Sequence, residues 1–397
     1  MINLKMKALG EQGSAIRELF EYGKLRKSVI GEDNVYDFSL GNPNVCAPEI
    51  VNLELIRLLT EEDSVRLHGY TSSDGSIDVR KRIIEYINST YEVNEDYKYI
   101  YMTSGAAAGL TISLNACLNE GDEVIVFAPF FPEYRVFIEK AMGKVIVVNP
   151  DANFLPDFTD FEAKISKKTK AIIINSPNNP TGVIYNEDII QKIVSILNNK
   201  QKEYNHDIYL ISDEPYRELV YDDYKYPFIT KYYDNSIVVY SFSKSLSIPG
   251  ERIGYVLVGH KCNSVDNVYY SIKGAGRALG FVCATSLFQY LIPKCLGVTA
   301  DINIYKENRD ILYNHLVKLG YDVVYPFGAF YLFVKALESD ACEFSKKALE
   351  EELLLVPSDS FGVGGYVRIS YCVSKDMILR SLNAFDKLMK KYKQEWF

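Results

Sequence analysis

The stretch SIVVYSFSKSLSIPGERIGYVLVG, residues 236–259, begins and ends with a short apolar run rich in Val and Ile. Five similar runs lie upstream of this stretch. None of the seven runs alternates apolar with polar residues, which is typical of strands buried on both faces of a sheet. Segments with helical spacing, such as 106–117 and 186–198, separate most of them. The sequence therefore predicts an α/β protein whose large domain has a mostly parallel seven-stranded sheet flanked by helices. The five upstream runs are YIYMT (99–103), EVIVFA (123–128), KVIVVN (144–149), KAIIIN (170–175) and IYLIS (208–212).

The pattern changes after about Phe281, where long helical stretches such as 298–319 begin. Short strand candidates lie among these helices, which predicts a smaller α+β domain. Residues 1–40 contain one predicted helix, 14–27, and no strand of the main series, so we expect them to pack with the C-terminal part. The expected division is a large domain at 41–285 and a small domain formed by 1–40 and 286–397. The strand candidates are YDVVYP (321–326), AFYLFVK (329–335) and YVRISYC (366–372).

The composition excludes several classes of protein. The 397 residues are 48% hydrophobic, with a net charge of −8 and no basic run, so nothing indicates binding to nucleic acid. Seven cysteines without a CxxC pair argue against a disulfide framework and against a metal site, and they indicate thiols in a reducing compartment. The N-terminus lacks an apolar signal core and no run is long enough to span a membrane. We therefore expect a cytoplasmic protein.

Residues with useful chemistry follow directly after four of the predicted strands. Ligands of such sheets bind beyond the carboxyl ends of the strands, so these residues are expected to meet in one crevice. Taken singly, Asp213 could be a helix cap, Tyr216 a core aromatic, Lys244 a solvated lysine and Arg252 a surface ion-pair partner. Their order and spacing together favour a shared site. The four segments are SGAAAG (104–109), SPNNPTG (176–182), DEPY (213–216) and FSKS (242–245), the last followed by Arg252 and Gly254.

Three of these motifs carry a resemblance to a known family. NNPTG, SDEPY and SFSKSLSIPGERIGY, in this order, resemble the fold type I pyridoxal-5'-phosphate (PLP) enzymes of the class I/II aminotransferase family, which is aspartate aminotransferase-like. The resemblance runs from about Ser39 to Arg368. It implies the PLP-dependent transferase fold and an enzyme that moves an amino group from an L-amino acid to a 2-oxo acid. The expected acceptor is 2-oxoglutarate, with a ping-pong mechanism through Lys244.

The resemblance also implies roles for individual residues. Lys244 forms the Schiff base with PLP and, once displaced by substrate, shuttles the proton. Asp213 pairs with the pyridine nitrogen, so that the ring acts as an electron sink. Asn179 and Tyr216 hydrogen-bond the phenolate oxygen of the cofactor. Phe131 stacks on the pyridine face, with an ordinary core position as the alternative.

The phosphate of the cofactor is expected at the start of the helix after the first strand. Small residues there, Gly105 among them, let backbone N–H groups approach an anion. Where relatives sometimes have polar side chains, this chain has alanine twice, so only backbone contact is available at those two positions. The resemblance assigns the phosphate to the backbone of Ala106 and Ala107, to the hydroxyls of Ser241 and Ser243, and to Arg252.

Five residues are implied in binding the substrate or the partner subunit, and Asn179 is one of those implied in binding the substrate. Arg368 resembles the arginine that binds the substrate α-carboxylate, and the backbone of Gly41 approaches the same group. Tyr70 resembles the tyrosine that reaches the phosphate of the neighbouring subunit, which implies a homodimer with shared active sites. Arg277, 33 positions after Lys244, lies near the place where dicarboxylate-specific relatives have an arginine donated across the dimer. A solvated or structural arginine is the alternative.

The motifs leave the reaction and the substrate partly open. A PLP-dependent carbon–sulfur β-lyase would use the same cofactor residues. A non-catalytic PLP-binding regulator is disfavoured, because only about forty residues precede the Gly41 motif, too few for a DNA-binding domain. The donor could be dicarboxylic, aromatic, branched or alanine-like.

Overall fold

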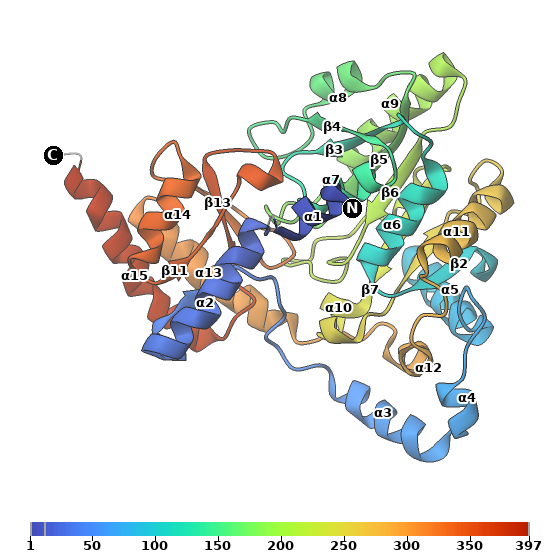
Figure 1. Cartoon of the computed structure of the whole chain (residues 1–397), viewed down its shortest axis with the longest axis horizontal. Coiled ribbons are helices and arrows are strands. Elements are labelled where there is room, and N and C mark those ends of the chain that lie inside the picture. Colours follow the sequence, from blue (N-terminus) through green and yellow to red (C-terminus); the bar gives the residue numbers. More distant parts are fainter. Residues whose placement is uncertain (1, 12, 396–397) are drawn as a thin grey trace.

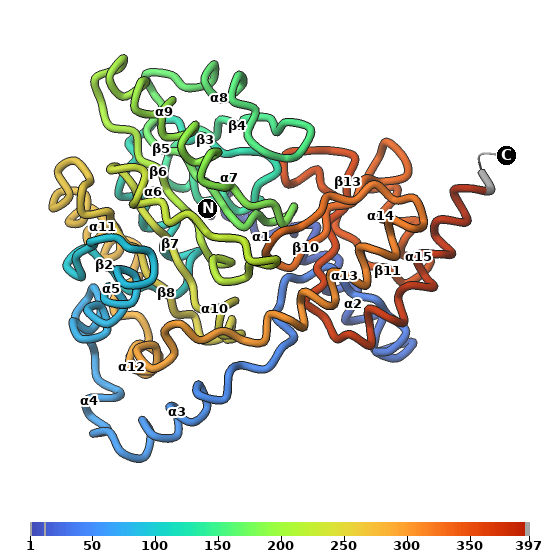
Figure 2. Tube along the Cα trace, turned by 180° about the vertical axis from the view of Figure 1, so that it is seen from behind, coloured from blue at the N-terminus to red at the C-terminus, as the bar shows by residue number. Residues whose placement is uncertain are grey.

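The structure is a computed structural model that describes residues 2–11 and 13–395. Figure 1 shows a larger part built around a sheet and a smaller part beside it, and Figure 2 shows the same division from behind. The larger part contains one seven-stranded sheet with the strand order β2-β8-β7-β6-β5-β3-β4. The strands are β2 (Ile100–Thr103), β3 (Glu123–Phe127), β4 (Lys144–Val148), β5 (Thr169–Asn175), β6 (Tyr209–Asp213), β7 (Ser236–Ser241) and β8 (Gly254–Val258).

All seven apolar runs of the sequence are strands of this one sheet. Strand β8 pairs antiparallel with both of its neighbours, and the other pairings are parallel. The predicted mostly parallel sheet is therefore confirmed. Every residue of β2, β7 and β8 is buried, which explains why these runs do not alternate with polar residues.

Successive residues of a strand enter two different cores. In β3, Val124 and Val126 pack into the core beneath α6, α7 and α11, whereas Ile125 and Phe127 pack into the core beneath α5, α8, α9 and α12. Helices thus cover both faces of the sheet (Figure 1). These helices are α5 (Ile77–Tyr91), α6 (Ala106–Cys117), α7 (Glu133–Lys140), α8 (Phe158–Lys164), α9 (Glu187–Tyr204), α11 (Val265–Leu279) and α12 (Ser286–Cys295).

The smaller part has its own core around a four-stranded antiparallel sheet of order β12-β13-β10-β9. The N-terminal segment joins it: β1 (Tyr36–Asp37) pairs with β11 (Leu353–Leu354), and α2 contacts β12. Helix α2 (Ala15–Ile30) starts where the Ser14 side chain accepts a hydrogen bond from the backbone of Arg17. The remaining elements here are α13 (Ile302–Leu319), β9 (Val323–Val324), β10 (Tyr331–Lys335), α14 (Ala341–Leu349), β12 (Val356–Pro357), β13 (Tyr366–Ser370) and α15 (Lys375–Glu395).

Helix α12 packs with the larger part. It contacts α3 (Glu49–Glu61), α4 (Ser64–His68) and α5, and its residues Leu291 and Ile292 belong to the core of the large sheet. The sequence-based division at 285/286 places this helix in the small domain, whereas its contacts tie it to the large one. In the described part of the chain, no helix is both long and apolar enough to cross a membrane.

Candidate active site

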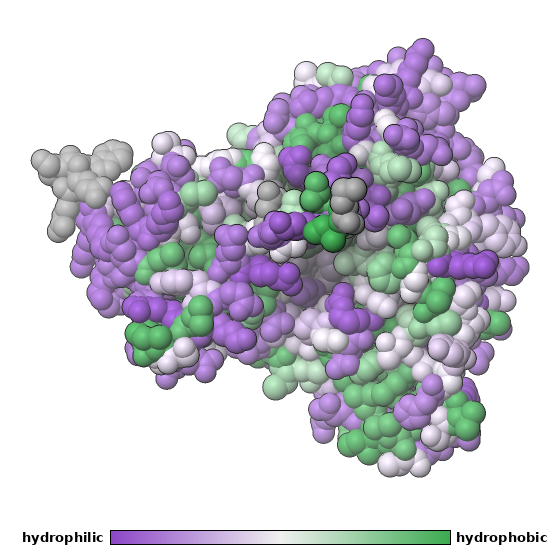
Figure 3. Space-filling model, viewed as in Figure 1, coloured by the Kyte–Doolittle hydropathy of each residue, from purple (hydrophilic) through white to green (hydrophobic). Residues whose placement is uncertain are grey.

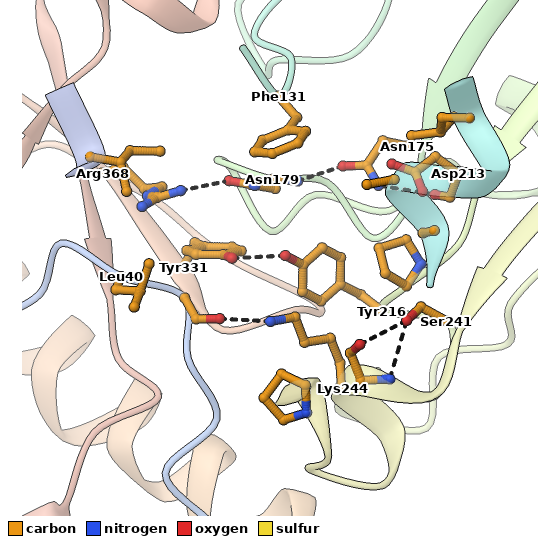
Figure 4. A pocket seen from close by; sticks show the side chains of 18 of the residues that line it. Leu40, Phe131, Asn175, Asn179, Asp213, Tyr216, Ser241, Lys244, Tyr331 and Arg368 are labelled. Carbon is orange, nitrogen blue, oxygen red and sulfur yellow. Dashed lines mark hydrogen bonds between the residues drawn. The ribbon is translucent and has the colours of Figure 1, made fainter. Parts of the chain in front are cut away.

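A cavity of about 240 Å³ opens at the carboxyl ends of the large sheet, where the two parts of the molecule meet. Figure 4 shows side chains from both parts pointing into it. Twelve of the residues that the sequence assigned to a site line this cavity: Gly41, Ala106, Ala107, Phe131, Asn179, Asp213, Tyr216, Ser241, Ser243, Lys244, Arg252 and Arg368.

The end of β5 and the loop after it hold two asparagines in place. The Asn175 side chain donates to the backbone carbonyl of Asp213 (2.9 Å) and accepts from the backbone N–H of Asn179 (2.8 Å). Asn178 braces the same loop, since its Oδ1 accepts from the hydroxyl of Thr181 (2.7 Å). These bonds fix the backbone of Asn179 at the edge of the cavity.

Asp213 ends β6 and is buried. Its Oδ2 accepts a hydrogen bond from the hydroxyl of Tyr134, and its Oδ1 has no hydrogen-bond partner. Burial raises the pKa of this carboxyl to about 7, because the charged form is poorly solvated, although the bond from Tyr134 lowers it. The side chain thus offers one free carboxylate oxygen in a site that disfavours an unpaired negative charge.

Lys244 lies in the short helix α10 (Phe242–Ser245), which is capped by the Ser241 side chain. Its Nζ donates to the carbonyl oxygen of Gly41 (2.7 Å) and lies 5.5 Å from the centre of the Phe330 ring. Burial lowers the pKa of the amine to about 8, and the nearby Arg252 contributes to this shift. The amine therefore loses its proton more readily than an ordinary lysine.

One corner of the cavity collects hydrogen-bond donors. Helix α6 begins there, with its unpaired N–H groups at Ala106 and Ala107. The Ser241 hydroxyl lies 2.8 Å from that of Ser243, which in turn accepts from Arg252 Nη1 (3.4 Å). Gly105 precedes the helix with φ +81°, and a Cβ there would lie 2.5 Å from Arg252 Nη2. The corner is thus a cup of backbone, hydroxyl and guanidinium donors, which suits an anion.

On the other side of the cavity, Arg368 of β13 is 2% exposed. Its Nη1 donates to Asn179 Oδ1 (3.1 Å) and its Nη2 donates to the carbonyl oxygen of Ser39. Both partners are neutral, and Nε has no partner at all. Burial lowers the pKa of this guanidinium. The geometry leaves a buried cation without an anion.

Three sequence-assigned residues lie outside the cavity. Gly105 lies against the side chain of Arg252, which itself lines the cavity. Tyr70 is 97% exposed and Arg277 is exposed near the end of α11. Neither lines the cavity.

The sequence interpretation missed several residues of the site. Tyr134 bonds Asp213, Asn175 joins two loops, and the hydroxyl of Tyr331 lies 2.7 Å from that of Tyr216. Ile16 and Leu40, from the N-terminal segment, also line the cavity. A polar residue at the end of a buried run could have indicated Asn175, but the tyrosines carry no local signal.

Comparisons with known proteins agree with this architecture. Residues 33–385 match the family model described as aminotransferase class I and II. A probable aspartate aminotransferase of Methanocaldococcus jannaschii is 31% identical over 384 residues, covering 94% of this chain and 96% of that protein. The aspartate aminotransferase of Thermotoga maritima is 32% identical over 366 residues, covering 90% of this chain and 92% of that protein.

Solved structures give the same result. An amino transferase of Eubacterium rectale superposes with a TM-score of 0.97 at 52% identity, covering 99% of each chain. The Thermotoga maritima aspartate aminotransferase superposes with a TM-score of 0.85 at 30% identity, covering 98% of this chain and all of the other. The chain therefore belongs to the class I and II aminotransferase family of PLP-dependent transferases, and it is an aminotransferase.

Proposed function

We propose that the cavity binds PLP between Asp213 and the donor cup, and that the enzyme passes the amino group of an L-amino acid to a 2-oxo acid in two half-reactions. The expected acceptor is 2-oxoglutarate. One observation supports this assignment above all. Two buried polar atoms, Asp213 Oδ1 and Arg368 Nε, have no hydrogen-bond partner, and their side chains line the cavity from opposite sides, with Asn179 between them (Figure 4). One suits a ring N–H group and the other a carboxylate.

The donor set fits the cofactor at each of its polar groups. When bound, PLP supplies an aldehyde for amines and a conjugated ring that withdraws electrons from the substrate Cα. Asp213 Oδ1 is free to accept from the ring nitrogen, and the ring cation would keep this carboxyl ionised despite its burial. The cup of Ala106, Ala107, Ser241, Ser243 and Arg252 would hold the phosphate.

Two side chains are left with hydrogens for the phenolate oxygen. Asn179 Oδ1 already accepts from Arg368, so its Nδ2 group remains to donate. The Tyr216 hydroxyl points into the cavity, with the hydroxyl of Tyr331 as its neighbour. Phe131 lines the cavity and shows a ring that can cover the face of the cofactor.

Substrate binding and proton transfer are assigned to residues across the cavity. The α-carboxylate would satisfy Arg368 and approach the backbone of Gly41. Lys244 Nζ, whose pKa is lowered to about 8, would take the proton from the substrate Cα. In the structure, Nζ donates to the Gly41 carbonyl and so lies beside the proposed substrate site.

The active form is proposed to be a homodimer with shared sites. Tyr70 is almost fully exposed, and Figure 3 shows apolar side chains gathered over the neighbouring helices α3 and α4. The chain after α11 runs beside the chain after Tyr70, because Cys283 N–H donates to the Ser73 carbonyl (3.2 Å). Arg277 and Tyr70 thus belong to one side of the subunit, from which both could reach a partner. The exposed apolar residues here include Leu53, Ile56, Leu59 and Val65.

The assignment of Lys244 can be tested directly. Borohydride should bleach the visible absorption of the holoenzyme and leave a covalent adduct on Lys244, found by peptide mass spectrometry. Lys244→Ala should lose both the adduct and the transfer of amino groups. Lys261→Ala, at an exposed lysine, is the matched control and should keep both. An adduct on another lysine would overturn the assignment.

The same preparation identifies the reaction. A panel of amino acids with 2-oxoglutarate should yield glutamate and the matching 2-oxo acids. Formation of pyruvate and ammonia from cystathionine, without any amino transfer, would instead indicate a carbon–sulfur β-lyase.

A further inference from the structure

Tyr331 is a buried tyrosine that the family motifs leave without a role, and it contacts groups on two sides of the cavity. Its hydroxyl lies 2.7 Å from the hydroxyl of Tyr216. Its ring lies 4.8 Å from the guanidinium carbon of Arg368. Figure 4 shows it between these two residues, with its hydroxyl directed toward Tyr216.

The position of Tyr331 links the two parts of the molecule. It begins β10 in the small sheet, whereas Tyr216 lies in the loop after β6 of the large sheet. Its hydroxyl also lies against Gly41, where a Cβ atom would collide with it. Tyr331 thus occupies the place where the small sheet, the large sheet and the N-terminal segment meet.

The direction of the hydrogen bond between the two tyrosines follows from counting hydrogens. A tyrosine hydroxyl has one hydrogen to donate. If Tyr216 donates its hydrogen to the cofactor, the bond between the tyrosines exists only with Tyr331 as the donor. Burial raises the pKa of Tyr331 to about 12, so its hydroxyl keeps this hydrogen over the working range of pH.

We propose that Tyr331 is a positioning residue: its hydroxyl donates to Tyr216 and so orients and strengthens the hydrogen bond that Tyr216 gives to the phenolate oxygen of PLP. This inference rests on the proposed role of Tyr216. Hydrogen bonds in a chain polarise one another, so the first bond strengthens the second. The ring of Tyr331 has a separate task, because it lies against the guanidinium of Arg368, which has no anion beside it, and holds it by a cation–π contact.

The two tasks have different measurable consequences. A hydrogen bond donated to the phenolate oxygen withdraws part of its negative charge. The phenolate then stabilises the proton on the Schiff-base nitrogen of Lys244 less, and the pKa of this nitrogen falls. Losing the Tyr331 hydroxyl should therefore raise the pH midpoint at which the visible absorption of the holoenzyme changes. Losing the ring should instead weaken the binding of amino acids at Arg368, which raises KM.

The test is a visible pH titration of holoenzyme variants, combined with steady-state kinetics. Tyr216→Phe should raise the midpoint by about one pH unit, because it removes the direct bond. Tyr331→Phe should raise it by about 0.3 of a unit and leave KM within about twofold. Tyr331→Leu should show the same shift together with a roughly tenfold higher KM. The control, Tyr371→Phe, removes a buried hydroxyl that donates to the Ala329 carbonyl outside the cavity, and should change neither.

The outcomes distinguish a failure of the role proposed for Tyr331 from a failure of the role proposed for Tyr216. A midpoint that moves in Tyr216→Phe but not in Tyr331→Phe would overturn the role of Tyr331 alone. A midpoint that moves in neither variant would remove Tyr216 from the cofactor and the inference with it. An equal shift in Tyr371→Phe would show that the effect is a general response of the core.

Discussion

Two buried arginines have opposite surroundings: Arg217 in the loop that follows β6, and Arg368 in β13. Arg217, which does not line the cavity, lies 2.6 Å from the Glu214 carboxylate, donates to the Tyr255 hydroxyl (3.0 Å) and lies over the Tyr240 ring at 4.2 Å. Arg368, in the cavity, has only neutral oxygens as partners. Burial lowers the pKa of both, but Tyr255 and Glu214 reverse this effect for Arg217, whose pKa is raised.

The difference separates an arginine whose charge is balanced within the fold, Arg217, from one whose charge is left unbalanced, Arg368. Burying an arginine without an anion costs free energy, and folding alone provides no reason for it. Under the proposed function, the anion that pairs with Arg368 is the carboxylate of the bound substrate. Arg217 already has its anion and has none to attract.

Exchanging each arginine for methionine should give opposite results. Arg368→Met should lower kcat/KM for amino acids about 10³-fold, because charge-assisted bonds to the carboxylate are lost. Its free energy of unfolding should stay within about 1 kcal/mol of wild type. Arg217→Met leaves Glu214 buried without a cation and should lose about 3 kcal/mol or more. Steady-state kinetics and denaturant unfolding of both variants provide the measurements, and equal destabilisation by the two would break the distinction.

Asp213 extends the comparison to an anion without a cation. Its pKa of about 7 lies above the value of about 4 in an unfolded chain, so the folded apoenzyme binds an extra proton between these values and loses stability as the pH rises through this window. Asp213→Asn removes this titration. The variant without cofactor should be more stable than wild type at pH 8, on the order of 2 kcal/mol, and equal to it near pH 4.

Asp222 is the matched control for this effect. Arg309 lies 2.9 Å away and, by its hydrogen bond, lowers the pKa of Asp222 to about 2. The sign is therefore reversed: Asp222→Asn should be less stable than wild type at neutral pH, with the difference vanishing as the pH falls through about 2. Thermal unfolding of both apo-variants across pH measures this, and an Asp213→Asn variant that is less stable at pH 8 would contradict the account.

The smallest effect is expected at Arg277. Among the described residues lining the cavity, the cations are Lys244, Arg252 and Arg368, all with assigned partners. If Arg277 of a partner subunit supplies the missing charge for a distal carboxylate, Arg277→Ala should lower kcat/KM for aspartate about tenfold and leave alanine unchanged. Arg82→Ala, at another exposed arginine, is the control. An equal loss with both amino acids would remove Arg277 from substrate recognition.

The sequence predicted the strands and the residues at their ends because both depend on local patterns. Each apolar run became a strand, and residues directly beyond the runs, such as Asp213 and Asn179, reached the cavity because the carboxyl ends of parallel strands share one edge. The helix 106–117 was predicted to the residue.

What the sequence did not reveal depends on contacts between distant segments. The bond between Tyr134 and Asp213 spans 79 positions, and the one between Tyr216 and Tyr331 spans 115. In a chain with 31 tyrosines, nothing local marks these particular ones. The placement of α12 is similar, since its apolar face fits either core and only the path of the chain decides between them.

The antiparallel pairing of β7 with β8 has a consequence for how such enzymes diversify. Because these neighbours run in opposite directions, one short connection carries Ser243, Lys244 and Arg252, and their mutual spacing does not depend on any crossover helix. Arg368 and Tyr331 belong to another sheet, built from a different third of the chain. Under the proposed function, mutations in the smaller sheet can therefore change the choice of amino acid without altering the spacing of Ser243, Lys244 and Arg252.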